Sequence, residues 1–235
     1  MTSVPPLIFV ASDRREAERW VARWENPQSM DLPVHWARAG TWGGRDVIAV
    51  ANGVGAHRAA DAIAAAQVMA KGFSGICSIG TGGALDSSLT IADVIVGSSV
   101  TDGQKEWAAA DPHGPPARSG LVHSSAHIAR TIEEKRKLNQ SGAILVEMEA
   151  AGVARAAQEL AVPFYCIRVV SDLSDEAFFI DFESCIMPNG RFNVPRLVMQ
   201  ALAHPARGFP ELLRLQRRTA DAAKKLGNFL AECKF

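Results

Sequence analysis

The sequence predicts an α/β layer fold with a mostly parallel sheet, and two observations support this class. Short runs rich in β-branched and aromatic residues alternate along the chain with segments whose apolar residues recur at helical spacing. Hydrophobic residues make up 48% of the 235 residues, which is enough to bury a sizeable core. Because we find no internal repeat and no low-complexity tract, we expect a single domain over residues 1–235.

The first elements are a strand, a helix and a hairpin. Residues 7–11 form a continuous apolar run, as in a buried strand. The helix that follows is expected to end before Pro27, and its apolar face consists of Ala17, Trp20, Val21 and Trp24. Strands at 34–37 and 46–51 are expected to pair as a hairpin through Gly40, Gly43 and Gly44.

The alternation continues to the end of the chain. The expected elements are a helix at 56–70, strands at 74–79 and 93–98, a surface loop at 111–120, a helix at 149–160 and a central strand at 164–170. A final amphipathic helix is marked by Leu212, Leu215, Leu226, Phe229 and Leu230.

Charge and cysteine content exclude several classes of protein. Lys and Arg together number 25, as do Asp and Glu, so there is no net positive charge to hold a nucleic acid. The apolar run at 7–11 is too short to span a membrane and lacks the flanks of a signal peptide, so we expect a cytoplasmic protein without stable membrane insertion. The four cysteines are widely spaced, and we expect reduced thiols and no structural zinc.

Two glycine-rich segments each follow a strand candidate. Residues 52–57 (NGVGAH) and 79–85 (IGTGGAL) both fail the dinucleotide fingerprint, because Arg58 and Leu85 stand where glycine or alanine is needed. As turns at strand ends, they would still place backbone N–H groups at the sheet edge where α/β proteins bind ligands. The segments therefore indicate a small polar ligand, and glycines that serve only tight turns are the alternative.

The most informative segment is 146–151 (VEMEAA), followed by 168–172 (RVVSD). Glu147 and Glu149 are two residues apart at a strand-to-helix junction, so their side chains point in different directions. Asp172 ends an apolar strand, where partial desolvation would raise its pKa toward the range of a general acid. A helix-terminal role for Glu149 and a capping role for Asp172 are the alternatives.

These motifs resemble the purine nucleoside phosphorylase and methylthioadenosine/S-adenosylhomocysteine nucleosidase superfamily, in the family's order from residue 7 to 172. More narrowly, residues 134–136 and the tail 205–226 resemble the hopanoid-associated nucleosidase/phosphorylase subgroup. The resemblance implies a three-layer sandwich with a central mixed, mostly parallel sheet. It also implies a homodimer, a small-molecule nucleoside substrate and no cofactor.

The resemblance also implies roles for individual residues. Asp172 would protonate N7 of the purine, with Ser171 holding its carboxylate. Glu149 would bind the ribose hydroxyls as an ionised carboxylate, and Met148 would pack against the sugar. Glu147 would have a supporting role near the sugar or at a dimer contact. Asp172→Asn is expected to cost about a hundredfold in turnover with little change in stability.

The choice between hydrolysis and phosphorolysis depends on charge. Family phosphorylases carry an arginine where Ser78 stands, and nucleosidases carry a water-activating glutamate at the position of Glu16. Both residues favour hydrolysis, with Thr81 bonding the water and Gly82 contacting the substrate. The alternatives are a phosphate contact from Arg14 and Arg15 in a shifted loop, and a solvated Glu16 opposite Arg19 or Arg23.

The expected function is hydrolysis of the N-glycosidic bond of a purine nucleoside, with adenine as base and a 5′ substituent. A phosphorylase and an inactive nucleoside-binding protein are the alternatives. Residues 177–182 (AFFIDF) are either a buried structural helix or an apolar wall over the 5′ substituent. His123 and His127 stand where an apolar aromatic contact with the base is expected, which puts the adenine preference in question.

Overall fold

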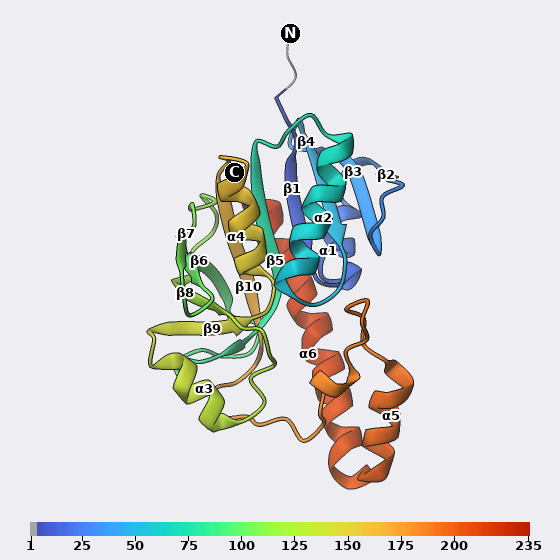
Figure 1. The fold of residues 1–235 in the computed structure, drawn as a ribbon, viewed down its shortest axis with the longest axis vertical. Helices are drawn as coiled ribbons and strands as arrows, with labels where there is room; N and C mark the ends of the chain where they lie inside the picture. The colour runs from blue at the N-terminus through green and yellow to red at the C-terminus, as the bar shows by residue number, and fades with distance from the viewer. Residues whose placement is uncertain (1–3) are drawn as a thin grey trace.

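A computed structural model describes residues 4–235, and its ten strands form one mixed sheet (Figure 1). The strands are β1 (Leu7–Ala11), β2 (Glu25–Ser29), β3 (Trp36–Trp42), β4 (Arg45–Ala51), β5 (Gly75–Ala84), β6 (Val94–Thr101), β7 (Glu106–Ala108), β8 (Arg118–Ser124), β9 (Ala143–Glu147) and β10 (Phe164–Asp172). The helices are α1 (Arg14–Val21), α2 (Ala56–Met69), α3 (Ile132–Asn139), α4 (Ala150–Glu159), α5 (Val194–Ala203) and α6 (Pro205–Glu232), with a short 3₁₀ turn at Glu183–Cys185.

Parallel pairs occupy the centre of the sheet. β1 lies between β4 and β5, and β10 joins β5 on its other side, all in parallel. β5 is long enough for its second half to turn away and pair with β9 in antiparallel register. Because β6 and β8 connect β10 to β9, five strands close into a ring. This closure brings the ends of β5, β9 and β10 together.

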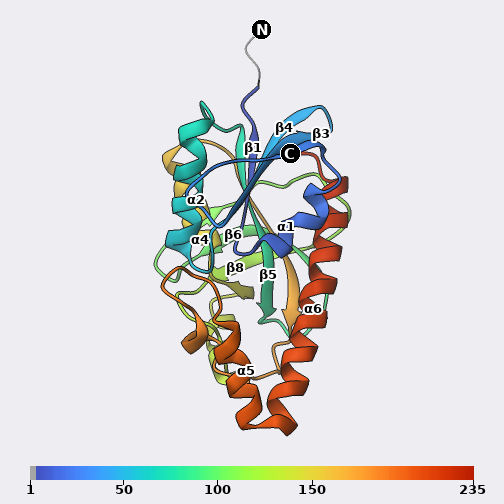
Figure 2. The same ribbon diagram turned by 90° about the vertical axis from the view of Figure 1, so that its right-hand side faces the viewer.

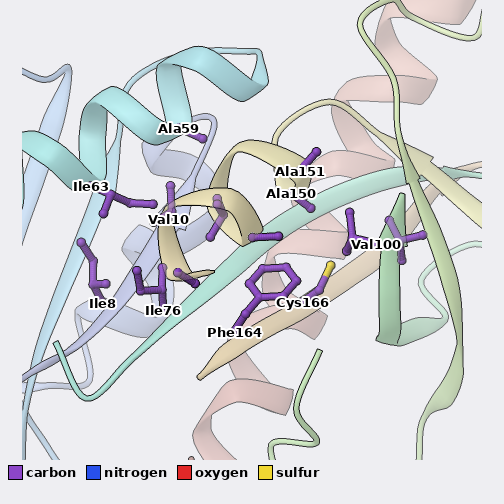
Figure 3. Close-up of a cluster of buried hydrophobic side chains, with 14 of the residues drawn as sticks. Ile8, Val10, Ala59, Ile63, Ile76, Val100, Ala150, Ala151, Phe164 and Cys166 are labelled. Atoms are coloured by element: carbon purple, nitrogen blue, oxygen red, sulfur yellow. The ribbon is translucent and has the colours of Figure 1, made fainter. Parts of the chain in front are cut away.

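Helices cover both faces of the sheet, which makes the predicted three-layer sandwich. α2 and α4 pack against each other on one face, and α1 and α6 pack together on the other (Figure 2). A separate apolar cluster fills each interface. Figure 3 shows part of the first cluster, where Ile63 of α2 lies beside Ile8 and Val10 of β1.

Several predicted boundaries need correction. The first helix ends at Val21, but Trp24 stays buried, with its ring 5.0 Å from that of Trp20 and nearly perpendicular to it. Pro27 lies in β2, a short exposed edge strand where a missing N–H is tolerated. The glycine segment that starts at Gly80 is not a turn, because β5 continues through it to Ala84. β8 begins at Arg118, inside the predicted surface loop 111–120, and α3 and α5 were not predicted.

The last two helices form a hairpin that extends beyond the sheet. The C-terminal half of α6 packs against α1 and β10, burying Leu226 and Leu230 completely. The first half of α6 and all of α5 project below the sheet in Figures 1 and 2. Within residues 4–235, none of the helices combines the length and the apolar character needed to cross a membrane. All four cysteines are buried and unpaired.

Candidate active site

A cavity of about 280 Å³ lies at the edge where β1, β4, β5, β9 and β10 end. Ends of parallel strands are the usual ligand position in α/β sheets, as the glycine segments predict. Four of the residues that line the cavity are carboxylates, and none is lysine or arginine. These carboxylates are Glu16, Glu147, Glu149 and Asp172.

Glu16 sits in the first turn of α1 with its carboxylate buried in the cavity wall. It completes a capping box with Asp13, whose N–H donates to Oε2 at 3.3 Å. Ser12 donates both its N–H and its hydroxyl to the same oxygen at 3.0 Å. Thr81 donates its N–H to Oε1 at 2.9 Å, and its hydroxyl lies 3.3 Å from that oxygen. With 7% of Glu16 exposed, the alternative of a solvated helix carboxylate is wrong.

Glu149 immediately precedes α4 and reaches the glycine turn after β4. Its Oε1 accepts the N–H of Gly55 at 2.9 Å. Burial raises the pKa of Glu149 to about 8, and the neighbouring Glu147 carboxylate adds to the shift. This shift favours the protonated form of Glu149 in the free protein, whereas the sequence predicted an ionised carboxylate.

Glu147 ends β9 and forms a buried ion pair with Arg168 of β10. Arg168 donates to Glu147 Oε2 through Nε, at 3.2 Å, and through Nη2. Burial disfavours the charged guanidinium, but the Glu147 charge outweighs it and raises the pKa of Arg168. Nη2 also donates to the Ser78 hydroxyl at 2.6 Å, and the Glu147 carboxylate accepts the N–H groups of Glu149 and Ala150. Glu147 therefore joins β9, β10 and α4.

Asp172 ends β10 and is held between a lysine and a serine. Lys135 of α3 is completely buried, and its Nζ donates to Asp172 Oδ2 and to the carbonyl oxygen of Leu173, both at 2.6 Å. The Ser171 hydroxyl lies 2.8 Å from Asp172 Oδ1. The centre of the Phe178 ring lies 5.3 Å from the Lys135 ammonium. Asp172 is therefore half of a buried ion pair, and it also faces the cavity.

Glycines in β5 let these carboxylates approach the strand. A Cβ on Gly80 would lie 2.8 Å from Glu16 Oε1, and one on Gly83 would lie 2.7 Å from Asp172 Oδ2. Gly82 is packed against β9, at Leu145 and the Val146 carbonyl, and does not line the cavity. Gly83 takes the place in the cavity wall that was predicted for Gly82, because the strand continues, and a substrate contact by Gly82 stays a prediction.

Gly83→Ala is expected to displace the Asp172 carboxylate, because the new methyl group needs the space of Oδ2. If Asp172 acts on the substrate, kcat/KM falls by roughly tenfold to a hundredfold, the usual cost of misplacing a catalytic group. The measurement is base release by the variant, compared with its melting temperature. Unchanged kcat/KM would contradict this role of Gly83.

Apolar side chains also line the cavity and form one part of its wall, which we call the apolar wall. Phe178, Phe182 and Phe192 supply three aromatic rings, and Leu215 comes from α6. Residues 177–182 form an irregular segment, so the alternative of a buried helix is wrong, and the wall over a 5′ substituent stays a prediction. A wider hollow of about 430 Å³ adjoins the cavity and shares Ile128 and Phe182 with it.

The two histidines of the predicted base-binding segment differ in position. His127 lines the cavity, and its Nδ1 lies 2.5 Å from Glu183 Oε1. His123 lies on β8 away from the cavity, where burial lowers its pKa and its Nδ1 has no partner among residues 4–235.

Most of the predicted site residues meet at this cavity. Those that line it are Glu16, Thr81, Glu147, Met148, Glu149, Ser171 and Asp172. Lys135 and Arg168 were missed as functional residues. The sequence does contain a signal for Arg168, because a charged residue inside an apolar strand needs a buried partner. Lys135 has none, because it sits in a helix of mostly polar residues.

The model of the family described as "Phosphorylase superfamily" matches residues 34–116 and 103–186, which together make up more than half of the sequence. The chain belongs to the phosphorylase superfamily. A curated relative, the 5′-methylthioadenosine/S-adenosylhomocysteine nucleosidase of Staphylococcus aureus (strain bovine RF122 / ET3-1), is 27% identical over 139 residues. That alignment covers 46% of this chain and 61% of the relative, so the chain spans less than two thirds of the curated relatives it matches.

Solved structures of nucleosidases share the fold over nearly the whole length. The 5′-methylthioadenosine/S-adenosyl homocysteine nucleosidase of Helicobacter pylori has a TM-score of 0.72 at 15% identity and covers 97% of both chains. That of Neisseria meningitidis, in complex with methylthio-immucillin-A, has a TM-score of 0.69 at 19% identity, with 97% and 99% covered. Within residues 4–235, no three His, Cys, Asp or Glu side chains are grouped to hold a metal ion.

Proposed function

We propose that this protein hydrolyses the N-glycosidic bond of a purine nucleoside. The observation that carries the proposal is the set of four carboxylates around one cavity that no lysine or arginine lines. Breaking such a bond creates a cationic, oxocarbenium-like sugar and a base that leaves as an anion unless it is protonated. The reaction therefore requires an acid beside the purine base and a negative charge beside the sugar.

Asp172 is the proposed acid at N7 of the purine. Ser171 and Lys135 contact one carboxylate oxygen each, so the group has a fixed orientation. Asp172 is paired with Lys135 as a carboxylate, so it must first take up a proton from water; when it passes that proton to N7 it returns to the carboxylate, which the Lys135 ammonium at 2.6 Å stabilises. Lys135 acts here as a positioning residue, because it touches Asp172 and does not line the cavity.

Glu149 and Met148 are the proposed sugar contacts. Within residues 4–235, the protein donates a hydrogen bond to one oxygen of Glu149, from Gly55, which leaves the other oxygen to contact hydroxyl groups of the ribose. With a pKa of about 8, the ionised form of Glu149, which places negative charge beside the cationic sugar, gains population as the pH rises. The Glu147 carboxylate already accepts hydrogen bonds from the Arg168 guanidinium and from the backbone at the start of α4, which supports a scaffold role for Glu147.

Glu16 is the proposed general base for water. Its carboxylate is fixed by Ser12 and Thr81 at the cavity wall, and it would repel a phosphate dianion. The arginines that could favour a phosphorylase are engaged elsewhere. Arg14 lies 3.6 Å from Glu18, and Arg15 lies 2.8 Å from Asp13. Neither lines the cavity, so hydrolysis is preferred to phosphorolysis.

The proposed substrate carries adenine and an apolar 5′ substituent. The nucleosidase names of the relatives support the base, and the wall of Phe178, Phe182 and Phe192 supports an apolar group beside the sugar. The test is base release from adenosine, inosine and 5′-methylthioadenosine in phosphate-free buffer. We expect release to be fastest from 5′-methylthioadenosine. No release from any of the three would contradict the proposal.

Glu149→Gln is expected to raise the barrier by about 2 kcal/mol, roughly thirtyfold in kcat/KM, because glutamine cannot supply the negative charge of the ionised carboxylate to the cationic sugar. The effect should depend on the sugar hydroxyl that Glu149 binds. The substitution should therefore lower kcat/KM less for a 2′-deoxy nucleoside than for its ribose counterpart, when each substrate is assayed with the parent protein and with Glu149→Gln. Equal losses would show that Glu149 does not contact the 2′ hydroxyl.

The raised pKa of Glu149 also predicts how stability depends on pH. The folded state keeps the proton up to a pH of about 8, while an unfolded chain releases it near 4.5, so this group makes the fold less stable as the pH rises between these values. Glu149→Gln removes the penalty. Thermal unfolding should give similar melting temperatures at pH 4.5, and an advantage for the variant that grows to several degrees by pH 8. A pH-independent difference would contradict the shift.

A further inference from the structure

The projecting hairpin of α5 and the first half of α6 exposes most of the large apolar side chains at the surface. Nine such side chains are exposed in residues 4–235, and six of them belong to this hairpin. We call these six the hairpin face: Val194, Val198, Met199, Leu202, Phe209 and Leu213. Met199 and Leu202 are exposed by 66% and 57%, so the protein itself leaves these groups in water.

The buried sides of α5 and α6 both contact residues 179–181. Gln200 of α5 accepts the N–H of Asp181, and Glu211 of α6 accepts the N–H groups of Phe179 and Ile180. Ala201 and Gly208 meet between the helices, where a Cβ on the glycine would lie 2.5 Å from the Cα of the alanine. At 100° per residue, the hairpin face therefore lies on the side of both helices turned away from the segment that anchors them.

Almost all charged residues in and next to this hairpin are arginines. Between residues 191 and 220 the sequence contains six arginines, and Glu211 is its one carboxylate. Glu211 is buried and bonded to backbone, and two of the arginines pair with Glu176. The other four form no ion pair within residues 4–235, and they are Arg191, Arg196, Arg207 and Arg217.

We propose that the hairpin face docks onto the surface of an anionic lipid bilayer. Helices that carry apolar side chains on one side and arginines without acidic neighbours bind in this way, with the apolar groups at the level of the lipid headgroups. The negative surface attracts the unpaired arginines, and the apolar side chains leave water. Leu215 and Thr219, further along α6, line the cavity, so docking would bring the cavity close to the bilayer.

A second copy of the chain fits this surface less well. In a twofold dimer the same patch meets itself, so the arginines of one hairpin would face those of the other with no exposed carboxylate between them. A bilayer supplies the missing negative charge. The hairpin is also a projecting end of the molecule (Figures 1 and 2), which suits docking onto a flat surface.

The test is sedimentation of the full chain with vesicles. One set contains phosphatidylcholine alone, and the other an equal mixture of phosphatidylcholine and phosphatidylglycerol. We expect binding to the mixed vesicles that weakens with added salt, and little binding to phosphatidylcholine. Met199→Gln/Leu202→Gln and Arg196→Glu/Arg207→Glu should each reduce partitioning by about tenfold or more.

The matched control is Val68→Gln/Met69→Gln, which removes exposed apolar side chains at the end of α2, outside the hairpin. This variant should bind the mixed vesicles like the parent protein. Melting curves identify any variant that fails to fold. The proposal is overturned if the parent protein does not bind the vesicles that contain phosphatidylglycerol, or if all three variants bind these vesicles as strongly as the parent protein does. Light scattering that shows a dimer broken by the Met199→Gln/Leu202→Gln change, without vesicle binding, would assign the face to a second copy instead.

Discussion

Asp172→Asn is expected to reduce turnover on the order of a hundredfold or more, because asparagine cannot deliver a proton to the leaving base. The variant is also expected to lose about 3 kcal/mol of stability. Lys135 is completely buried, and its ammonium has Asp172 as its carboxylate partner, so removing one charge leaves the other uncompensated. The sequence predicted little change in stability, and the buried lysine is the reason for the correction.

The double variant Lys135→Met/Asp172→Asn separates the two effects. It removes both charges and places an apolar chain of similar length in the buried position, so most of the lost stability should return. Turnover should not return, because the acid is still missing. The measurements are urea unfolding at neutral pH and base release under single-turnover conditions. Near-parental turnover in either variant that lacks Asp172 would refute the acid role.

Glu16→Gln is expected to lower hydrolysis on the order of a thousandfold, the upper range for loss of a general base. Glutamine keeps the shape of the side chain and can still complete the capping box of α1, so the fold should be retained. Nucleoside binding should change little, because water activation contributes to the transition state more than to the bound substrate. Equilibrium binding of a nucleoside and single-turnover base release measure the two quantities separately.

Glu18→Gln is the matched control for this prediction. Glu18 lies on the same helix, is exposed and pairs only loosely with Arg14 at 3.6 Å. Its replacement should leave hydrolysis and stability unchanged. If Glu16→Gln retains full activity while Asp172→Asn does not, the base lies elsewhere and the cleavage chemistry must be reassigned.

The layered fold could be predicted because local patterns and tertiary packing agree. β1, α2 and β10 are continuous or periodic apolar runs, and each is buried as its pattern indicates. α3, α5 and β8 were not predicted, because packing against other elements decides their structure more than a local pattern does. β8, for example, is exposed at its start and is held by β6 and β9.

The site was predictable where residues lie at strand ends, and less so where side chains meet across the fold. Glu149 and Asp172 follow apolar strands, so their motifs and positions coincide. Lys135 reaches Asp172 from a helix 37 residues earlier, a contact that no spacing rule contains. Gly83 looked like part of a turn, yet it lies inside β5, and its missing side chain makes room for Asp172.

The most direct test of the account is the identity of the sugar product. The protein is incubated with 5′-methylthioadenosine, with and without saturating inorganic phosphate, and the products are identified by mass spectrometry and phosphorus NMR. The account predicts equal rates in both buffers and a sugar that carries a free hydroxyl at the anomeric carbon, because carboxylates line the cavity and repel phosphate. A rate that requires phosphate, with a sugar 1-phosphate as the main product, would contradict it.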